Sequence, residues 1–506
     1  MHAPVADPVV SFWGHGDAVG LVLDGLSATE ERQVLRRLTS RRFDDWAAAA
    51  SRVGHCTGPI RVRGTSTTFD VATGQPIRCY STDSEPLGVL HLRCGNRRAD
   101  VCPSCSRLYA ADMFHLLRSG VVGGKGVPAH VADNPLVFAT LTAPSFGAVH
   151  SAASASGRCH PRSKAPRCPH GRSTACFKRH VDVDSELGQP LCWECYNYRS
   201  QVVWQWWAPE LWRRFTIALR RAVARHLGVA PRDLNTVATV QYAKVAEFQL
   251  RGVVHFHALI RCDGPRTDDG FSEAPASVSS SVLANLVAAA AAAVHFTAPP
   301  VLDESHERQL QFGRQVDARA VTGARRLDDP SSSLKPEQVA GYLAKYSTKS
   351  ATASADGGSN AHLRRIKAVA GAVADATEHD GDPDESAPYE LMSHWVHMLG
   401  FRGHFATKSR RYSVTLGALR RARQRAQRLL AHAEEAGQPL DLAAMDALLM
   451  ADEEDETTLV IGDWRFAGTG WETPGDAALA RAAAARAREY DQWRAEQRRS
   501  GSNRRS

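Results

Sequence analysis

The sequence predicts an α+β fold in which antiparallel strands are flanked by helices. Residues 237–249 and 253–261 have the composition and the alternation of two strands. Only Leu250-Arg251-Gly252 separates them, so we expect the two strands to pair as an antiparallel hairpin. Residues 199–227 have the apolar spacing of a long amphipathic helix. Together these patterns favour a mixed fold that contains an antiparallel sheet.

Local signals predict the other elements. Ser27 can serve as the N-cap of a first helix, Pro144 ends a strand, and Pro336 is suited to the first turn of a helix. In chain order we expect a helix within 29–50, a helix within 109–118, a strand at 136–142, an alanine-rich helix at 282–294, a helix from Pro336 and a basic helix at 416–434.

Changes in composition divide the chain into five parts. The fourth part is rich in Ala, Gly, Asp and Ser, which is typical of a linker. The parts are an N-terminal helical segment (1–54), a first cysteine-rich region (55–128), a central domain (129–350) with a cysteine-rich insertion at 151–198, a flexible linker (351–388) and a basic C-terminal region (389–506).

The overall charge suits a polyanionic partner. The 506 residues carry a formal net charge of +8, and the pI is near 9.0. The N-terminus lacks the basic and apolar regions of a signal peptide, and no apolar stretch is long enough to span a bilayer. We therefore expect a cytoplasmic protein that is not bound to a membrane. Thiols stay reduced in the cytoplasm, so the 11 cysteines point to metal binding.

The strand around His255 and His257 carries the most informative pattern in the chain. The two histidines are two residues apart, so their imidazoles lie on one face of the strand. We expect Gln249 opposite His255 and Glu247 opposite His257, on that same face. Glu247 is favoured as the third ligand, because a carboxylate holds a divalent cation better than an amide. Such a set suits Mg²⁺ or Mn²⁺ bound together with substrate phosphate, and a buried histidine pair without metal is the alternative.

A helix from Pro336 would place two tyrosines and two lysines on one stripe, since their spacings are three and four residues. Free tyrosine has a pKa of about 10 and is a weak nucleophile at neutral pH, so a neighbouring cation would have to activate it. A surface helix with interfacial tyrosines is an equally good interpretation of this pattern alone. The candidate catalytic residues are Tyr342, Lys345, Tyr346 and Lys349.

The cysteines predict two structural zinc sites, each with four sulfur or nitrogen ligands. The first site would use Cys94, Cys102 and Cys105. Its fourth ligand comes from one of three residues, Cys79, His91 or Cys56, and we select Cys79. The second site would use Cys168, Cys176, Cys192 and Cys195, with His170, His180 and Cys159 as competing ligands. Burial as plain core residues is the weaker alternative, because these segments lack apolar residues.

A basic run begins at Arg402 and contains no acidic residue up to Arg428. Such a run can bind phosphates, while His404, Phe405 or Tyr412 could stack on bases, and a solvated helix face is the alternative. No Gly-x4-Gly-Lys-Ser/Thr motif occurs, so we expect no NTPase motor. The candidate DNA-binding residues are Arg402, Lys408, Arg410, Arg411, Arg420 and Arg421.

Over roughly residues 90–425 the chain resembles the rolling-circle replication initiators of actinobacterial plasmids. These proteins are HUH endonucleases, named for two histidines that flank one hydrophobic residue, here Phe256. The resemblance implies a five-stranded antiparallel sheet with the histidine strand in its centre and the tyrosine helix packed over it. It rests on Cys94-Gly95-Asn96-Arg97-Arg98 with its knuckle to Cys105, Phe138-Ala139-Thr140-Leu141-Thr142, His255-Phe256-His257 and Tyr342-Leu343-Ala344-Lys345-Tyr346.

The resemblance also implies a reaction, carried out by residues 129–350 as the endonuclease domain. Tyr346 or Tyr342 attacks a phosphodiester of single-stranded DNA at the plasmid origin and keeps the 5′ phosphate. The free 3′ hydroxyl then primes synthesis, and a second tyrosine can close the circle. The implied partners are origin DNA, a host helicase and the replication machinery. The order in which the tyrosines act and the oligomeric state stay open.

Three other functions compete with this one. A two-tyrosine HUH transposase would carry the same motifs, and only genomic context separates it from an initiator. A conjugative relaxase fits less well, because its tyrosine usually precedes the histidine strand. A non-enzymatic zinc-containing DNA-binding regulator would explain the cysteines and the basic helix. It would not explain the histidine strand combined with the Tyr/Lys stripe.

Overall fold

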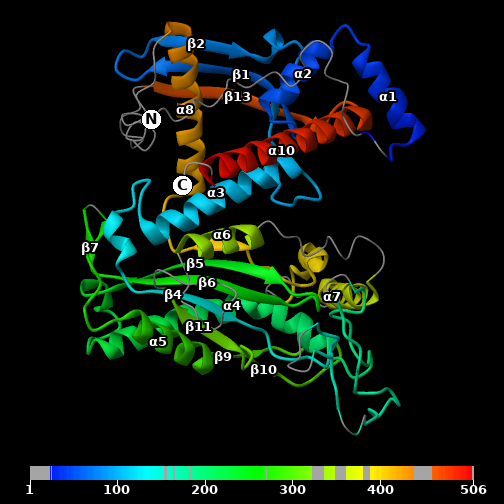
Figure 1. Cartoon of the computed structure of the whole chain (residues 1–506), viewed down its shortest axis with the longest axis vertical. Helices are drawn as coiled ribbons and strands as arrows, with labels where there is room; N and C mark the ends of the chain where they lie inside the picture. Colours follow the sequence, from blue (N-terminus) through cyan, green and yellow to red (C-terminus); the bar gives the residue numbers. More distant parts are fainter. Residues whose placement is uncertain are drawn as a thin grey trace. The chain divides into compact units, whose positions relative to one another are not determined.

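A computed structural model of the chain describes residues 23, 25–152, 157–162, 164, 166–181, 184–268, 270–321, 336–347, 360–379, 388–437 and 458–503 (Figure 1). The chain divides into two compact units. Unit 1 consists of Met1–Asp112 and Gln424–Ser506, and unit 2 consists of Met113–Arg423. Both ends of the chain therefore belong to one unit, whereas composition alone suggested separate parts. Among the described residues, none of the helices has the length and apolarity needed to cross a bilayer.

Unit 1 is built on an antiparallel sheet in the order β13-β1-β2, with β3 also paired to β1. Figure 1 shows β13, from the C-terminal part of the chain, beside β1. Trp46, Trp471 and Leu479 are buried in its core. Its strands are β1 (Ile60–Asp70), β2 (Pro76–Ser81), β3 (Leu90–Leu92) and β13 (Thr458–Thr469).

The first predicted helix is in fact two helices of unit 1. Ser27 caps the first of them as expected: its Oγ accepts from the backbone N–H of Glu30 at 3.3 Å, and the Glu30 carboxylate accepts from the Ser27 N–H at 2.8 Å. Helices α3 and α8 contribute residues to both units. The helices are α1 (Ala28–Leu38), α2 (Phe43–Arg52), α3 (Pro103–Val122), α8 (Leu416–Ala436) and α10 (Pro474–Asn503).

Unit 2 contains a five-stranded sheet in the order β11-β4-β6-β5-β12, in which every neighbouring pair is antiparallel. The strand with the two histidines, β6, is central, as expected. The strands are β4 (Leu136–Leu141), β5 (Thr239–Phe248), β6 (Val254–Asp263), β11 (Val316–Ala320) and β12 (Ala406–Lys408). Two short ribbons, β7 (Arg266–Thr267) with β8 (Gly270–Phe271) and β9 (His295–Ala298) with β10 (Arg308–Gln311), complete the strands described.

The two faces of this sheet have different neighbours. Val254, Phe256 and Ile260 of β6 point into the main core, which also contains buried residues of α4 (Tyr198–His226) and α5 (Ser280–Ala293). The opposite face carries His255 and His257 and is covered by α6 (Pro336–Ser347) (Figure 1). The tryptophans of α4 belong to the core.

A buried glutamine of α4 fixes the end of the β5–β6 hairpin. Gln205 Oε1 accepts from the Val254 N–H at 2.9 Å. Gln205 Nε2 donates to the carbonyl oxygens of Gly252, at 3.1 Å, and Leu399, at 2.9 Å. Since the Gln205 side chain has no exposure to water, each of these bonds satisfies a group that solvent cannot reach.

Helix α7 (Ala361–His379) lies within the segment predicted to be a flexible linker, and that prediction is wrong for these residues. Leu363, Ile366 and Ala370 recur at helical spacing and are buried in the main core. The high content of Ala, Gly and Asp concealed this amphipathic pattern. The rest of the predicted linker lies outside the described residues, apart from Asn360 and Pro388.

Replacing Gln205 by leucine is expected to destabilise the hairpin by about 2–6 kcal/mol. The Val254 N–H and the Leu399 carbonyl would lose their partners, at about 1–3 kcal/mol each, while Gly252 would keep the bond from Gln201. Hydrogen exchange of the hairpin amides is the measurement. Gln309→Leu, at an exposed position of β10, is the control and should leave hydrogen exchange of the hairpin amides unchanged. Equal protection in the two variants would contradict the role of Gln205.

Unit 2 is expected to lose stability as the pH falls from 6.5 toward 4. The fully buried His362 donates from Nε2 to the Arg251 carbonyl at 3.1 Å and accepts at Nδ1 from the Tyr198 hydroxyl at 3.2 Å. Burial lowers the pKa of His362 to about 4, so only the unfolded chain, with a pKa near 6.5, takes up a proton in this window. Above pH 6.5 the contribution is constant, and by pH 5 about 2 kcal/mol is lost.

Urea titrations at pH 7.5 and 5.0 measure this loss. The His362→Gln variant is the comparison, because every other titrating group is common to both chains. The original chain should lose about 2 kcal/mol more than the variant between the two pH values. Parallel losses would show that His362 does not control this dependence.

Candidate functional site

The β5–β6 hairpin brings three predicted metal ligands to one point. Glu247 faces His255 across the ladder, and Val245 faces His257. The predicted register, with Gln249 opposite His255, is therefore wrong by two residues. A turn at Leu250-Arg251-Gly252 itself places Gln249 opposite Val253, where its N–H donates to the Val253 carbonyl at 2.9 Å. Because the difference is an even number of residues, Glu247 stays on the histidine face.

Glu247, His255 and His257, here called the hairpin triad, converge through three atoms. Glu247 Oε2 lies 3.0 Å from His255 Nε2 and 3.2 Å from His257 Nε2. The two imidazole ring centroids are 4.3 Å apart. The side chains of Glu247 and His255 are 11% and 14% exposed, so the cluster is mostly buried and still open to a small ion.

Neighbouring polar groups orient the two rings. The hydroxyl of Thr140 on β4 lies 3.0 Å from His257 Nδ1, and it can accept the Nδ1 proton and leave Nε2 free for a metal. The amide nitrogen of Gln249 lies 3.4 Å from His255 Nδ1, and Arg251 Nε donates to Gln249 Oε1 at 2.9 Å. Gln249 therefore contacts the outer nitrogen of a triad histidine, away from the point of convergence. Sequence reasoning missed Thr140 and Arg251, because neither lies on the two strands of the hairpin.

Helix α6 places a predicted tyrosine beside the triad. The ring centroids of Tyr342 and His257 are 5.5 Å apart, with the rings nearly perpendicular. Phe138 stacks on His257 at 5.7 Å and meets the edge of Tyr342 at 6.0 Å. Lys345 is exposed on α6. The backbone of Tyr346 is in α6, whereas its side chain and the whole of Lys349 lie outside what the structure describes.

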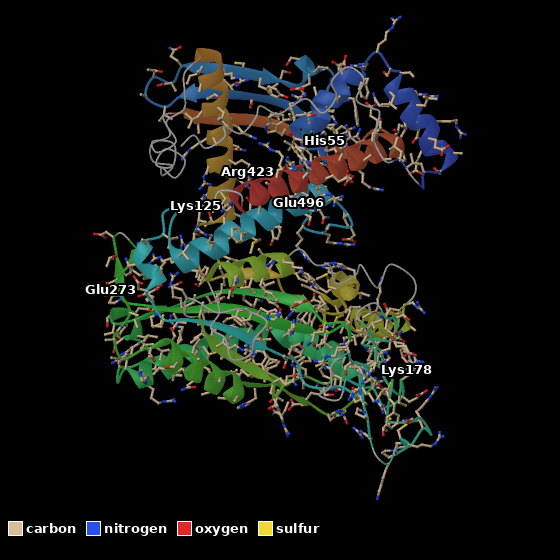
Figure 2. The ribbon with its side chains drawn as sticks, viewed as in Figure 1. His55, Lys125, Lys178, Glu273, Arg423 and Glu496 are labelled. Atoms are coloured by element: carbon tan, nitrogen blue, oxygen red, sulfur yellow. The ribbon has the colours of Figure 1, made fainter. Side chains whose placement is uncertain are left out.

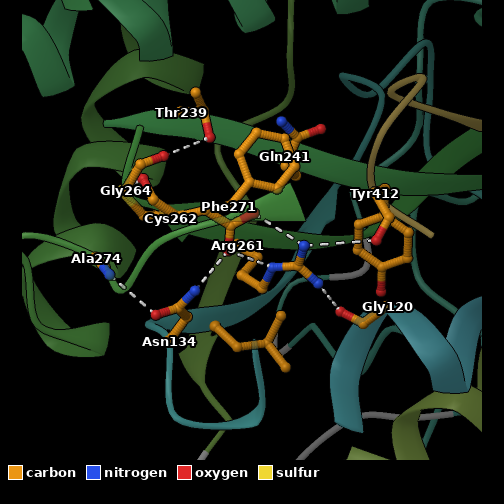
Figure 3. A network of polar contacts seen from close by, with 12 residues as sticks. Gly120, Asn134, Thr239, Gln241, Arg261, Cys262, Gly264, Phe271, Ala274 and Tyr412 are labelled. Atoms are coloured by element: carbon orange, nitrogen blue, oxygen red, sulfur yellow. Dashed lines mark hydrogen bonds and ion pairs between the residues drawn. The ribbon is translucent and has the colours of Figure 1, made fainter. Parts of the chain in front are cut away.

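The far end of the histidine face is closed by a buried ion pair (Figure 3). Arg261 donates to both carboxylate oxygens of Asp263, at 2.6 and 2.9 Å, and also to the Gly120 carbonyl at the end of α3. Asn134 Nδ2 donates to Asp263 Oδ1 at 2.7 Å. Tyr412, with its ring 5.4 Å from the Arg261 guanidinium, is fully buried here, so the idea that it stacks on bases is wrong.

In unit 1, Cys94, Cys102 and Cys105 converge with Cys56. The Sγ of Cys56 lies 3.8 Å from that of Cys102 and 3.6 Å from that of Cys105. Ligand atoms around tetrahedral zinc lie about 3.3–3.8 Å apart, so these separations fit such an ion. Cys79, which the sequence analysis selected, is exposed on β2 and contacts Thr67 instead. Of the three alternatives, Cys56 is the fourth member of the cluster, because the turn after α2 places it next to Cys102 and Cys105.

In unit 2, Cys168, Cys192 and Cys195 converge with His170. His170 Nδ1 lies 3.3 Å from Cys195 Sγ and 3.8 Å from Cys192 Sγ. Cys176, the fourth predicted member, lies in another cluster with His150, Cys159 and His180. The Cys-x-His spacing at 168–170 was the available signal for His170. The described residues thus contain three clusters of four Cys or His ligands, in addition to the hairpin triad.

The predicted DNA-binding residues fall into two groups. Arg402 donates to the Trp206 carbonyl at 3.1 Å and lies over the Trp206 and Trp207 rings, and Lys408 Nζ donates to the carbonyls of Arg410 and Ser413 at 3.0 and 2.9 Å. Burial lowers the pKa of Lys408 to about 8. These two cations serve the fold. The residues that remain exposed are Arg410, Arg411, Arg420 and Arg421.

The chain was compared with known proteins. It matches the family described as "Replication initiator protein, pSAM2" over residues 42–485, a range that includes the hairpin triad and all three clusters. A replication initiator protein from Streptomyces ambofaciens is 38% identical over 473 residues, which cover 90% of this chain and 93% of that protein. No solved structure matches the chain significantly. This chain therefore belongs to the pSAM2 family of replication initiator proteins.

Proposed function

We propose that this chain starts rolling-circle replication of a plasmid by nicking one DNA strand at the origin. Membership of the replication initiator family supports the role in initiation. The observation that carries the chemistry is the hairpin triad, with three ligand atoms at one point and Tyr342 beside it. This combination is what an HUH endonuclease needs, and the family assignment favours an initiator over a transposase.

The donor set of the triad favours Mg²⁺ or Mn²⁺. Two imidazoles and one carboxylate leave positions open, which suits an ion that also takes oxygens of the substrate phosphate. Glu247 Oε2 lies 3.0 Å from His255 Nε2 and 3.2 Å from His257 Nε2, so the three donor atoms are close enough to share one ion. When bound, the ion would neutralise charge that develops on the scissile phosphate.

The residues of α6 supply the nucleophile in this proposal. The phenolic oxygen of Tyr342 or Tyr346 attacks phosphorus in single-stranded DNA, and the bond from phosphorus to the 3′ oxygen breaks. The phenolic proton leaves, and the departing 3′ oxygen takes up a proton, so the products are a 5′-phosphotyrosine and a free 3′ hydroxyl. Lys345 and Lys349 stabilise the phenolate or the phosphate with their positive charge. Each reaction exchanges one phosphodiester for another, so the enzyme can later rejoin the strand.

Two of the Cys and Cys/His clusters are proposed to bind structural zinc. Cysteine-rich sets with separations near 3.3–3.8 Å and no open position are typical of structural rather than catalytic zinc. The four exposed arginines at 410, 411, 420 and 421 are proposed to hold origin DNA by its phosphates. The chain would act in the cytoplasm with a host helicase and the replication machinery, which extend the exposed 3′ end.

Removal of both tyrosine hydroxyls is expected to abolish nicking of supercoiled origin plasmid. The Tyr342→Phe/Tyr346→Phe variant should lose about 10³-fold or more of its rate and form no covalent adduct, because no tyrosine remains on α6. Denaturing gels that separate the protein-linked 5′ strand are the measurement, and the single variants identify which residue attacks. Tyr490→Phe, an exposed tyrosine of α10, is the matched control. Nicking by the double variant at the rate of the original chain would refute the mechanism. DNA binding by the original chain without any nicking would support a non-enzymatic regulator.

Neutralising the triad carboxylate is expected to weaken metal binding. In Glu247→Gln the concentration of Mn²⁺ or Mg²⁺ that gives half-maximal nicking should rise at least about tenfold, because one anionic ligand is lost. Glu273→Gln removes an exposed carboxylate of unit 2, labelled in Figure 2, and should leave the metal dependence unchanged. Identical metal titrations for the two variants would remove Glu247 from the site.

A further inference from the structure

The Cys/His segment of unit 2 contains a ligand set that neither the sequence pattern nor the family description assigns. We propose that His150, Cys159, Cys176 and His180 bind a structural zinc ion of their own, separate from the ion held by Cys168 and its partners. The four ligand atoms, one from each side chain, all lie within 4.8 Å of one another. The cysteine-rich insertion would then hold two ions rather than one.

The two nitrogen–sulfur separations within this set match a tetrahedral ion, and the nitrogen–nitrogen separation is slightly shorter. His150 Nδ1 lies 3.1 Å from His180 Nε2, Cys159 Sγ lies 3.8 Å from His150 Nδ1, and Cys176 Sγ lies 3.6 Å from His180 Nε2. Zinc with ligands at about 2.0–2.3 Å sets neighbouring nitrogen and sulfur atoms about 3.3–3.8 Å apart. Two sulfur and two nitrogen ligands are a common composition for closed structural sites.

Local backbone pairing brings the two cysteines together. The N–H of Cys176 donates to the His160 carbonyl at 3.0 Å, and the N–H of His160 donates back to the Cys176 carbonyl at 2.7 Å. The N–H of Ser151 points at Cys159 Sγ at 3.3 Å, which is a contact that stabilises a thiolate. Cys159, Cys176 and His180 are all buried in a segment with few apolar residues. A bound ion would stabilise this segment in place of an apolar core.

A carboxylate orients one of the histidines for metal binding. Asp184 Oδ2 lies 2.6 Å from His180 Nδ1 and accepts its proton, so the lone pair of Nε2 faces the cluster. Asp184 is itself held by the Glu186 N–H at 3.0 Å. Lys178, labelled in Figure 2, pairs with Glu186 at 2.8 Å and offsets the second negative charge.

The ion would fix one wall of a large cavity of about 980 Å³. His150 and Ser151 line this cavity on one side, and Gln249 and Arg251 of the hairpin turn line it on another. The chain at His150 is tied to a second stretch, since its N–H donates to the Gln189 carbonyl at 2.8 Å and its carbonyl accepts from Gly188 at 2.9 Å. Loss of the ion should therefore loosen residues 148–151 and 187–191 together.

The zinc content of purified full-length chains tests the proposal. Cys176→Ser and Cys195→Ser should each remove one zinc per chain, measured by mass spectrometry of the metals, and the double variant should remove two. Cys79→Ser, an exposed cysteine outside the clusters, is the matched control and should remove none. Differences between variants cancel any metal bound at the hairpin triad. A double variant that loses only one zinc, or a Cys176→Ser chain that loses none, would overturn the proposal.

Two milder variants keep the test decisive if a cysteine variant fails to fold. Asp184→Asn should keep the full zinc content but release one zinc to a chelator faster, in line with a roughly 10–100-fold weaker site. His160→Ala changes a neighbour of Cys159 Sγ that lies 3.0 Å away, and should remove no zinc. Unchanged release from Asp184→Asn, or the loss of a zinc from His160→Ala, would show that the ligand set is wrong. Hydrogen exchange at 148–151 and 187–191 should rise in step with that release.

Discussion

The pairing of β5 with β6 determines which side chains meet at the hairpin triad. The ladder sets Glu247 against His255, and alternation along β6 puts His257 on the same face. A slip of one residue would turn the Glu247 carboxylate toward the core that contains α4, away from both imidazoles. The structure resists such a slip at the turn, where Gln205 binds both Gly252 and Val254, and Arg251 donates to the Pro144 carbonyl at 3.1 Å. The buried helix α4 is thus part of the apparatus that positions a polar site on the other side of the sheet.

Much of the site could be predicted because its signals are local. Two histidines on one strand, and a tyrosine on the next helical stripe, need only the period of each element to be placed on a face. The register of β5 with β6 also depends on which two residues pair at the turn. An error in that pair shifted every predicted cross-strand partner by two residues. Helix α7 was missed for a different reason: its few large apolar residues, among them Leu363 and Ile366, lie in a segment whose overall composition is typical of a linker, and their burial in the main core depends on contacts with distant elements such as α4.

The partition of the cysteines could not be predicted, since it depends on contacts between distant segments. Cys56 joins the knuckle from a turn after α2, and Cys176 leaves the expected set because its backbone pairs with His160. The spacing of cysteines and histidines in the sequence indicates that metal ligands are present. It does not show which of several cysteines belong to the same site. The same limit applies to the basic run. Arg402 and Lys408 have the positive charge expected of DNA-binding residues, but Arg402 packs on a tryptophan ring and Lys408 donates to backbone carbonyls.

The pairing of β1 with β13 has a consequence for how the chain is made. β1 ends at Asp70, and its partner begins only at Thr458, after the whole of unit 2. A ribosome therefore synthesises the whole of unit 2 before the strand that completes the other sheet. An interrupted translation product would contain a folded unit 2 attached to an unpaired β1 edge, which is a form that invites aggregation and proteolysis. The core around Cys56, Cys102 and Cys105 also contains Trp471 and Leu479, so it can form fully only after these C-terminal residues have been synthesised.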